Sequence, residues 1–212
     1  MAWIQCNYHS DILGKTTSMN VIIPEPDIFY KRGELLKAGR FPVIYLLHGG
    51  KWTSIDWIRN TSVERYAMEN QAAVIMPNIE NGSYKNVENG MQYWSCLTDE
   101  VQAKAEIYFP ISGQREKCFA AGIGEGAYAA MKWGAKFPDR FHTVAGISPK
   151  WGNEQELEEC RIKYQDRKGP DGKIPEYLEY AEAVQEDGEY CDRALEEIFK
   201  ALPLPRNIYK NF

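Results

Sequence analysis

The chain has little of what several large classes of protein require. It holds no uninterrupted apolar run of about 18 residues, so no membrane-spanning helix is expected. Its start lacks the basic stretch and apolar core of a secretory signal. Lys and Arg (25) do not exceed Asp and Glu (30), so there is no basic footprint for nucleic acid. These absences favour a cytoplasmic protein that has neither a membrane nor a nucleic acid as its partner.

Histidine is scarce, and the cysteines are scattered along the chain. There are three histidines and five cysteines, and no C-x-x-C occurs. No group has the spacing of metal ligands, so neither a metal nor a cofactor is predicted. No cysteine has a histidine at a spacing that suggests a catalytic pair. The odd number of cysteines favours free thiols in a reducing compartment.

Short apolar runs alternate with helical patterns, which is typical of an α/β protein. Strands are predicted at 3–8, 18–23, 42–47, 72–76, 117–121 and 141–147, and helices at about 56–70, 97–108 and 125–136. The first two strands read as an antiparallel hairpin and the others as parallel strands with crossover helices. The 212 residues therefore predict one domain with a mostly parallel sheet of about six strands. Residues 151–212 read as a charged, helical or loop-like end of that domain.

One motif points to chemistry. Residues 119–128 read F-A-A-G-I-G-E-G-A-Y, so an apolar strand ends in Gly122-Ile123-Gly124-Glu125-Gly126 and passes into a helix. This is the spacing of the nucleophile elbow G-x-S-x-G, which places a serine on a tight strand-to-helix turn. The central position here is Gly124, and glycine has no side chain that could attack a substrate.

Several separate blocks resemble the esterase D-like branch of the α/β-hydrolases, which includes tributyrin-type carboxylesterases, S-formylglutathione hydrolase and the mycolyltransferases. The blocks are Y-L-L-H-G-G at 45–50, Asp56-Trp57, Tyr93-Trp94, the elbow at 121–128 and K-F-P-D-R-F at 136–141. The resemblance covers residues 1 to about 150 and is weak beyond them.

The resemblance implies a Ser-Asp-His triad in that chain order and two backbone N–H donors that hold the oxyanion. By position those donors are Gly50 and Glu125. The implied pocket candidates are His48, Gly49, Asp56, Trp57, Tyr84, Tyr93 and Trp94. Each also has a purely structural interpretation: hydrogen bonding for His48, helix capping for Asp56 and core packing for the aromatic residues.

Three departures from the family pattern stand out. The nucleophile position is Gly124, and Glu125 replaces a methionine, so its carboxylate would repel a developing oxyanion. The family's acid and base follow two further strands, both of which we expect to be missing, and no histidine follows His142. All three triad members are therefore predicted to be absent. Ser148 could substitute as the nucleophile, but it has no candidate base. Glu125 could act as a general base on water, but a carboxylate without a nucleophile partner is a poor ester hydrolase.

The sequence thus predicts a catalytically inactive esterase homologue that binds a small ester or acyl ligand or a protein partner. The alternatives are an active esterase with an unconventional or partner-completed site, and a purely structural or interaction protein. Without a seventh strand, the strand at 141–147 (from Phe141 to Ile147) would be an open apolar edge. We expect the C-terminal segment to fold over it, or a homodimer or other oligomer to cover it.

Overall fold

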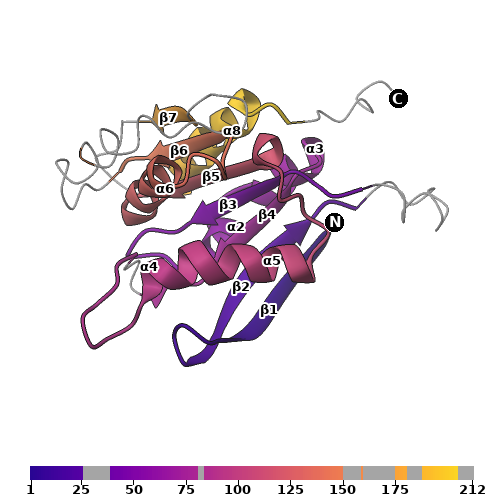
Figure 1. The fold of residues 1–212 in the computed structure, drawn as a ribbon. Coiled ribbons are helices and arrows are strands. Elements are labelled where there is room, and N and C mark those ends of the chain that lie inside the picture. Colours follow the sequence, from indigo (N-terminus) through magenta and orange to yellow (C-terminus); the bar gives the residue numbers. More distant parts are fainter. Residues whose placement is uncertain (26–38, 81–83, 150–158, 160–174, 181–187, 205–212) are drawn as a thin grey trace, which may run out of the picture.

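A seven-stranded sheet lies between two layers of helices (Figure 1). The computed structural model describes residues 1–25, 39–80, 84–149, 159, 175–180 and 188–204. The strand order is β1-β2-β4-β3-β5-β6-β7. The strands are β1 (Ala2–Ser10), β2 (Lys15–Ile23), β3 (Val43–Leu47), β4 (Ala73–Pro77), β5 (Cys118–Ile123), β6 (Thr143–Ile147) and β7 (Glu176–Tyr180). β1 and β2 pair antiparallel, as do β2 and β4, and all later pairs are parallel.

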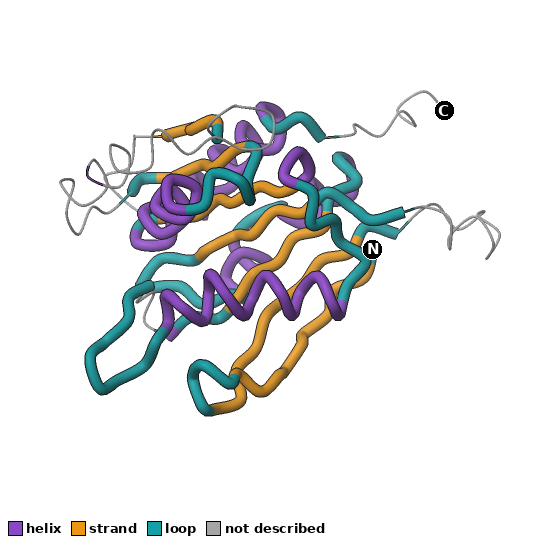
Figure 2. Tube along the Cα trace, in the orientation of Figure 1, coloured by secondary structure: helices purple, strands orange, loops and turns teal. Residues whose placement is uncertain are grey.

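The central strands are buried along their whole length because helices cover both faces of the sheet (Figure 2). The helices are α2 (Asp56–Asn60), α3 (Val63–Glu69), α4 (Tyr93–Ser95), the π-helix η2 (Cys96–Val101), α5 (Gln102–Tyr108), the short η3 (Arg115–Lys117), α6 (Glu125–Lys136) and α8 (Gly188–Ala201). Side chains of η2, α5 and α6 pack on one face, and those of α2, α3 and α8 on the other. This burial explains the continuous apolar runs of the sequence.

Three aromatic rings fix α6 on the sheet. Trp133 of α6 lies with its ring centroid 5.4 Å from Tyr45 of β3 and 4.8 Å from Phe141, which precedes β6. Both pairs meet edge to face, the geometry that aromatic rings prefer. The helix that begins at the elbow is thereby anchored to the strands on either side of β5.

The sheet has one strand more than the sequence predicted. β7 pairs in parallel with β6 from Thr143↔Glu176 to Ile147↔Tyr180, so the edge at 141–147 is covered by a strand of the same chain. The expectation that both last family strands are missing is wrong, and this edge gives no reason for a dimer. The sequence of β7, E-Y-L-E-Y, mixes glutamates with apolar residues, which makes its strand signal weak.

Two predicted helices differ in detail. The helix expected at 56–70 is interrupted by Thr61, whose backbone is extended (φ −139°, ψ 164°), and so forms α2 and α3. The helix expected at 97–108 begins at Tyr93 and runs as α4, η2 and α5 without a break. Its middle turn is π-helical, a wider winding that a 3.6-residue pattern does not reveal.

The C-terminal helix α8 is packed into the molecule. Its Leu195, Ile198 and Phe199 are buried, and the Tyr66 hydroxyl of α3 donates a hydrogen bond of 3.0 Å to the Asp192 carboxylate. The ring of Tyr66 also lies 5.7 Å from that of Phe199. Among the described helices, none combines the length and the apolar character needed to cross a membrane.

Candidate active site

The turn between β5 and α6 has the backbone of a nucleophile elbow. Gly124 has φ 57° and ψ −118°, a conformation that is strained for residues with a side chain. Its N–H donates to the Ile147 carbonyl at 3.0 Å, and its carbonyl accepts from the Tyr128 N–H at 3.2 Å. The sharp turn that presents a serine in this fold is therefore formed, but Gly124 presents no side chain.

The glycines that flank this position are required by close backbone contacts. A Cβ on Gly122 would lie 2.4 Å from the carbonyl carbon and oxygen of Gly126. Real Cβ atoms do not approach backbone so closely, because the overlap would force the turn to shift. The G-x-G-x-G spacing seen in the sequence therefore reflects the geometry of the turn itself.

The two residues predicted as oxyanion donors, Gly50 and Glu125, are joined by a hydrogen bond to the Glu125 side chain. Gly50 follows β3 in the loop 48–50, and its N–H donates a hydrogen bond of 2.8 Å to Oε2 of Glu125. A Cβ on Gly49 would lie 3.2 Å from the Ile123 carbonyl oxygen and 3.4 Å from the same Glu125 oxygen. The sequence suggested repulsion between Glu125 and an oxyanion. The structure adds that the Glu125 carboxylate itself accepts the hydrogen bond of the Gly50 donor.

His48 is buried, and both its ring nitrogens are engaged. Nε2 lies 3.1 Å from the Ile79 N–H and must accept from it, so Nδ1 carries the proton and donates to the Gly49 carbonyl at 2.9 Å. Burial lowers the pKa of the imidazole, which keeps it neutral. The buried Tyr84 hydroxyl donates to the His48 carbonyl at 2.8 Å. Both side chains therefore fix the loop 48–50.

Asp56 and Trp57 have structural partners. Oδ2 of Asp56 accepts from the Thr53 N–H at 2.7 Å and from its hydroxyl at 2.9 Å, which fixes the turn before α2. Trp57 is fully buried, and its ring centroid lies 5.1 Å from that of Trp52. The contacts of Trp57 agree with packing, the structural alternative that the sequence left open. Asp56 does not cap α2, because the N-cap is Ile55 and has no side-chain cap hydrogen bond; the Asp56 carboxylate holds the preceding turn instead.

Tyr93 and Trp94 are buried and contact charged groups. The Tyr93 hydroxyl donates to the Glu80 carboxylate at 2.8 Å, and Lys15 pairs with the same carboxylate. That pairing lowers the pKa of Glu80. The Trp94 ring lies under the ammonium groups of Lys132 and Lys136, at 5.1 and 5.5 Å. Such cation–π contacts stabilise the surface of α6.

Ser148 lies beside the elbow in an unusual conformation. The β5–β6 ladder ends at the pair Ile123↔Ile147, and Gly124 and Ser148 each follow that last pair directly. Its φ is 45°, which is uncommon for a residue with a side chain, and its buried Oγ has no hydrogen-bond partner within the described part of the chain. The sequence predicts a hydroxyl at the end of a strand, and nothing in it signals the positive φ.

The sheet order, the parallel crossovers and the elbow after β5 define the α/β-hydrolase fold of the serine hydrolases. Within that fold, residues 10–188 match the family described as "Putative esterase". The chain therefore belongs to this esterase family. The match runs past residue 150, where the resemblance read from the sequence became weak.

Relatives agree with this assignment. The chain is 29% identical over 168 residues to an acetyl esterase of Caldicellulosiruptor saccharolyticus; the match covers 72% of this chain and 62% of that protein's length. A fluorophosphonate-binding serine hydrolase of Staphylococcus aureus superposes with a TM-score of 0.80 at 24% identity, covering 94% of this chain and 97% of the other. S-formylglutathione hydrolase of the same organism gives 0.73 at 24% identity, with the same coverages.

The presence of β7 bears on the catalytic triad. The sequence predicts that the acid is absent because the strand before it is expected to be missing, and that strand is present. Residues 181–187, which follow β7, lie outside the described residues. No group of His, Cys, Asp and Glu that could hold a metal is found in the described ranges.

Proposed function

We propose that this chain is an esterase homologue that does not hydrolyse esters by the serine mechanism and that retains a binding role. The observation that carries the proposal is Gly124, which has the elbow backbone and no nucleophile. Covalent catalysis needs a side-chain atom at this point, since the reacting carbonyl is attacked there. An intact turn without that atom supports binding rather than turnover.

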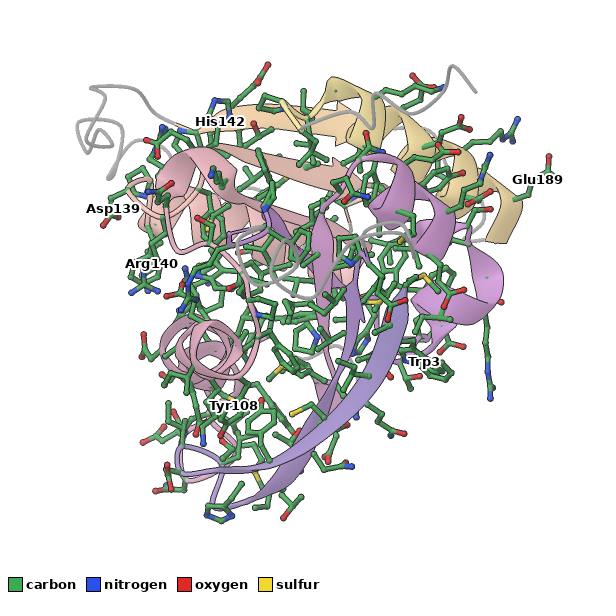
Figure 3. All side chains as sticks on the ribbon, turned by 90° about the vertical axis from the view of Figure 1, so that its right-hand side faces the viewer. Trp3, Tyr108, Asp139, Arg140, His142 and Glu189 are labelled. Carbon is green, nitrogen blue, oxygen red and sulfur yellow. The ribbon has the colours of Figure 1, made fainter. Side chains whose placement is uncertain are left out.

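The histidines of the chain also support the proposal. His48 is neutral, and its two ring nitrogens are hydrogen-bonded to backbone groups of Gly49 and Ile79. His9 belongs to the edge strand β1. His142 precedes β6 and so lies at the opposite end of the sheet from Gly124, with Asp139 and Arg140 on the side that faces the viewer in Figure 3. None of the three is placed to take a proton at the elbow.

The test is an ester hydrolysis assay on the purified chain, with p-nitrophenyl acetate and butyrate and with a fluorophosphonate probe. We expect hydrolysis at the rate of the buffer and no covalent labelling. A rate above that background, abolished by His48→Ala or Glu125→Ala, would overturn the proposal. A well-characterised serine esterase run in parallel shows that both assays work.

One observation favours a second candidate, an esterase with an unconventional site. The Ser148 hydroxyl adjoins the elbow on a strained backbone and is unpartnered among the described residues. It would need a base from elsewhere, because no histidine of this chain lies beside it. If residual hydrolysis is found and Ser148→Ala abolishes it, this candidate replaces the first.

We propose a small ester or acyl compound as the ligand and the cytoplasm as the compartment. The cysteines that the structure describes (Cys6, Cys96, Cys118 and Cys191) are all free thiols, which fits a reducing environment.

A further inference from the structure

The Glu125 carboxylate is hydrogen-bonded to the Gly50 amide, one of the two N–H groups that the family resemblance implies as donors to a substrate oxygen. Oε2 accepts the Gly50 N–H at 2.8 Å, and Gly50 is the donor that the loop after β3 supplies. A charged acceptor makes such a hydrogen bond stronger than a neutral one does. Any ligand oxygen that uses the Gly50 N–H must first displace this carboxylate.

The position of Glu125 in the fold strengthens this contact. Glu125 is the first residue of the 12-residue helix α6, where unpaired N–H groups and the helix dipole favour a negative charge. Its side chain therefore has a favourable electrostatic position and a specific partner from another loop. A second anion at the same place would find the Gly50 N–H already hydrogen-bonded and would be repelled by the Glu125 charge.

We propose that Glu125 sets the charge selectivity of the site: it competes for the Gly50 amide and excludes carboxylates, which leaves uncharged acyl compounds as the ligand class. This inference rests on the proposed function, because it treats the site as one that binds and does not turn over. It makes the ligand an ester or amide rather than a free acid.

The experiment compares acetate with acetamide, which has the same shape and carries no charge. Each is titrated into the folded protein while the Gly50 amide is followed by ¹H–¹⁵N NMR. In Glu125→Ala, the affinity for acetate relative to acetamide should rise about tenfold or more, because a like charge and a competing acceptor are removed. Glu125→Gln keeps an acceptor oxygen without the charge and should give an intermediate ratio.

Glu116→Ala is the matched control. It makes the same change in net charge on an exposed side chain before β5, at the far end of that strand from the elbow. Its acetate-to-acetamide ratio should equal that of the unmodified chain. An unchanged ratio in Glu125→Ala, or a Gly50 amide that does not respond to acetate in that variant, overturns the inference. If Glu125→Ala does not fold, the same comparison on Glu125→Gln decides.

Ester turnover measured on the same samples separates this inference from the proposed function. Turnover by the unmodified chain would refute the proposed function whatever the acetate ratio is. An absence of turnover together with equal acetate binding in all variants would refute only the charge selectivity.

Discussion

Gly126 lies directly against the carbonyl oxygen of Leu47, at the point where α6 leaves the elbow and passes the end of β3. A Cβ at Gly126 would be 2.4 Å from that oxygen and 2.6 Å from the carbonyl oxygen of His48. The start of the helix is therefore pressed onto the backbone that leads into the loop 48–50. This contact fixes the position of the elbow relative to the loop 48–50.

Gly126→Ala should therefore destabilise the protein strongly. The three atoms nearest to the added methyl group are all backbone atoms, which cannot move aside as a side chain can. We therefore expect a loss of about 3 kcal/mol or more in the free energy of unfolding. Urea unfolding monitored by tryptophan fluorescence measures it. Gly14→Ala is the comparison: at φ 65° a Cβ there meets no atom within 4 Å, and only the backbone strain of about 1 kcal/mol applies. Equal losses in both variants would contradict the close contact.

Gly124→Ser should not restore ester hydrolysis. The serine would sit on the elbow, but no histidine of this chain is positioned to take its proton, and the Glu125 carboxylate holds the Gly50 donor. The change should also cost about 1–3 kcal/mol of stability, because φ at this position is positive. Hydrolysis of p-nitrophenyl butyrate is the measurement, and Gly124→Ala, with the same strain and no hydroxyl, is the control. Turnover by the serine variant alone would show that a base is present.

The elbow was the part of the site that the sequence predicted best. Glycines at Gly122, Gly124 and Gly126 after a buried strand form a strong local signal, because the turn tolerates no Cβ at the flanking positions. The bounds of α6 were predicted as the structure has them. Local signals of this kind depend on a few neighbouring residues and can be read without knowing the rest of the fold.

The contacts that the sequence missed depend on residues far apart in the chain. The hydrogen bond between Gly50 and Glu125 joins positions 75 residues apart and depends on a side-chain rotamer. The pairing of β6 with β7 joins a strand with a clear apolar pattern to a segment whose glutamates weaken its strand signal. Neither has a periodic signature, so only the tertiary structure reveals them.

Glu100 should make stability depend on pH. Its buried carboxylate accepts hydrogen bonds from the Ser10 hydroxyl and from the Asp11 N–H, the latter at 2.9 Å. It also forms an ion pair with Lys104 at 3.2 Å. Burial opposes ionisation, but these three partners outweigh it and hold the pKa of Glu100 below its ordinary value of 4.5. A lowered native pKa means that the stabilisation is fully present above about pH 4.5 and is lost as the pH falls through the native pKa.

Glu100→Gln should therefore lower the free energy of unfolding by about 1–3 kcal/mol at pH 7, because buried donors lose a charged acceptor. The deficit should shrink as the pH falls below 4.5 and through the lower native pKa, because the native carboxylate then becomes protonated too. Urea unfolding at a series of pH values measures both effects. Glu88→Gln, on an exposed loop residue, should change neither the stability nor its pH dependence. A deficit that stays constant down to pH 3 would contradict the role of the charge.

Leu178→Pro should expose the edge that β7 covers. Leu178 pairs with Ala145 in the ladder and packs, partly buried, against the core beside α8. Proline removes the N–H and disfavours a strand, so β6 would become an open apolar edge. We expect the amides of β6 to lose protection in hydrogen exchange and the protein to self-associate on gel filtration. Leu178→Val keeps the N–H and a strand-forming side chain and should behave as the unmodified chain does. If the proline variant stays monodisperse with β6 protected, β7 is not what shields this edge.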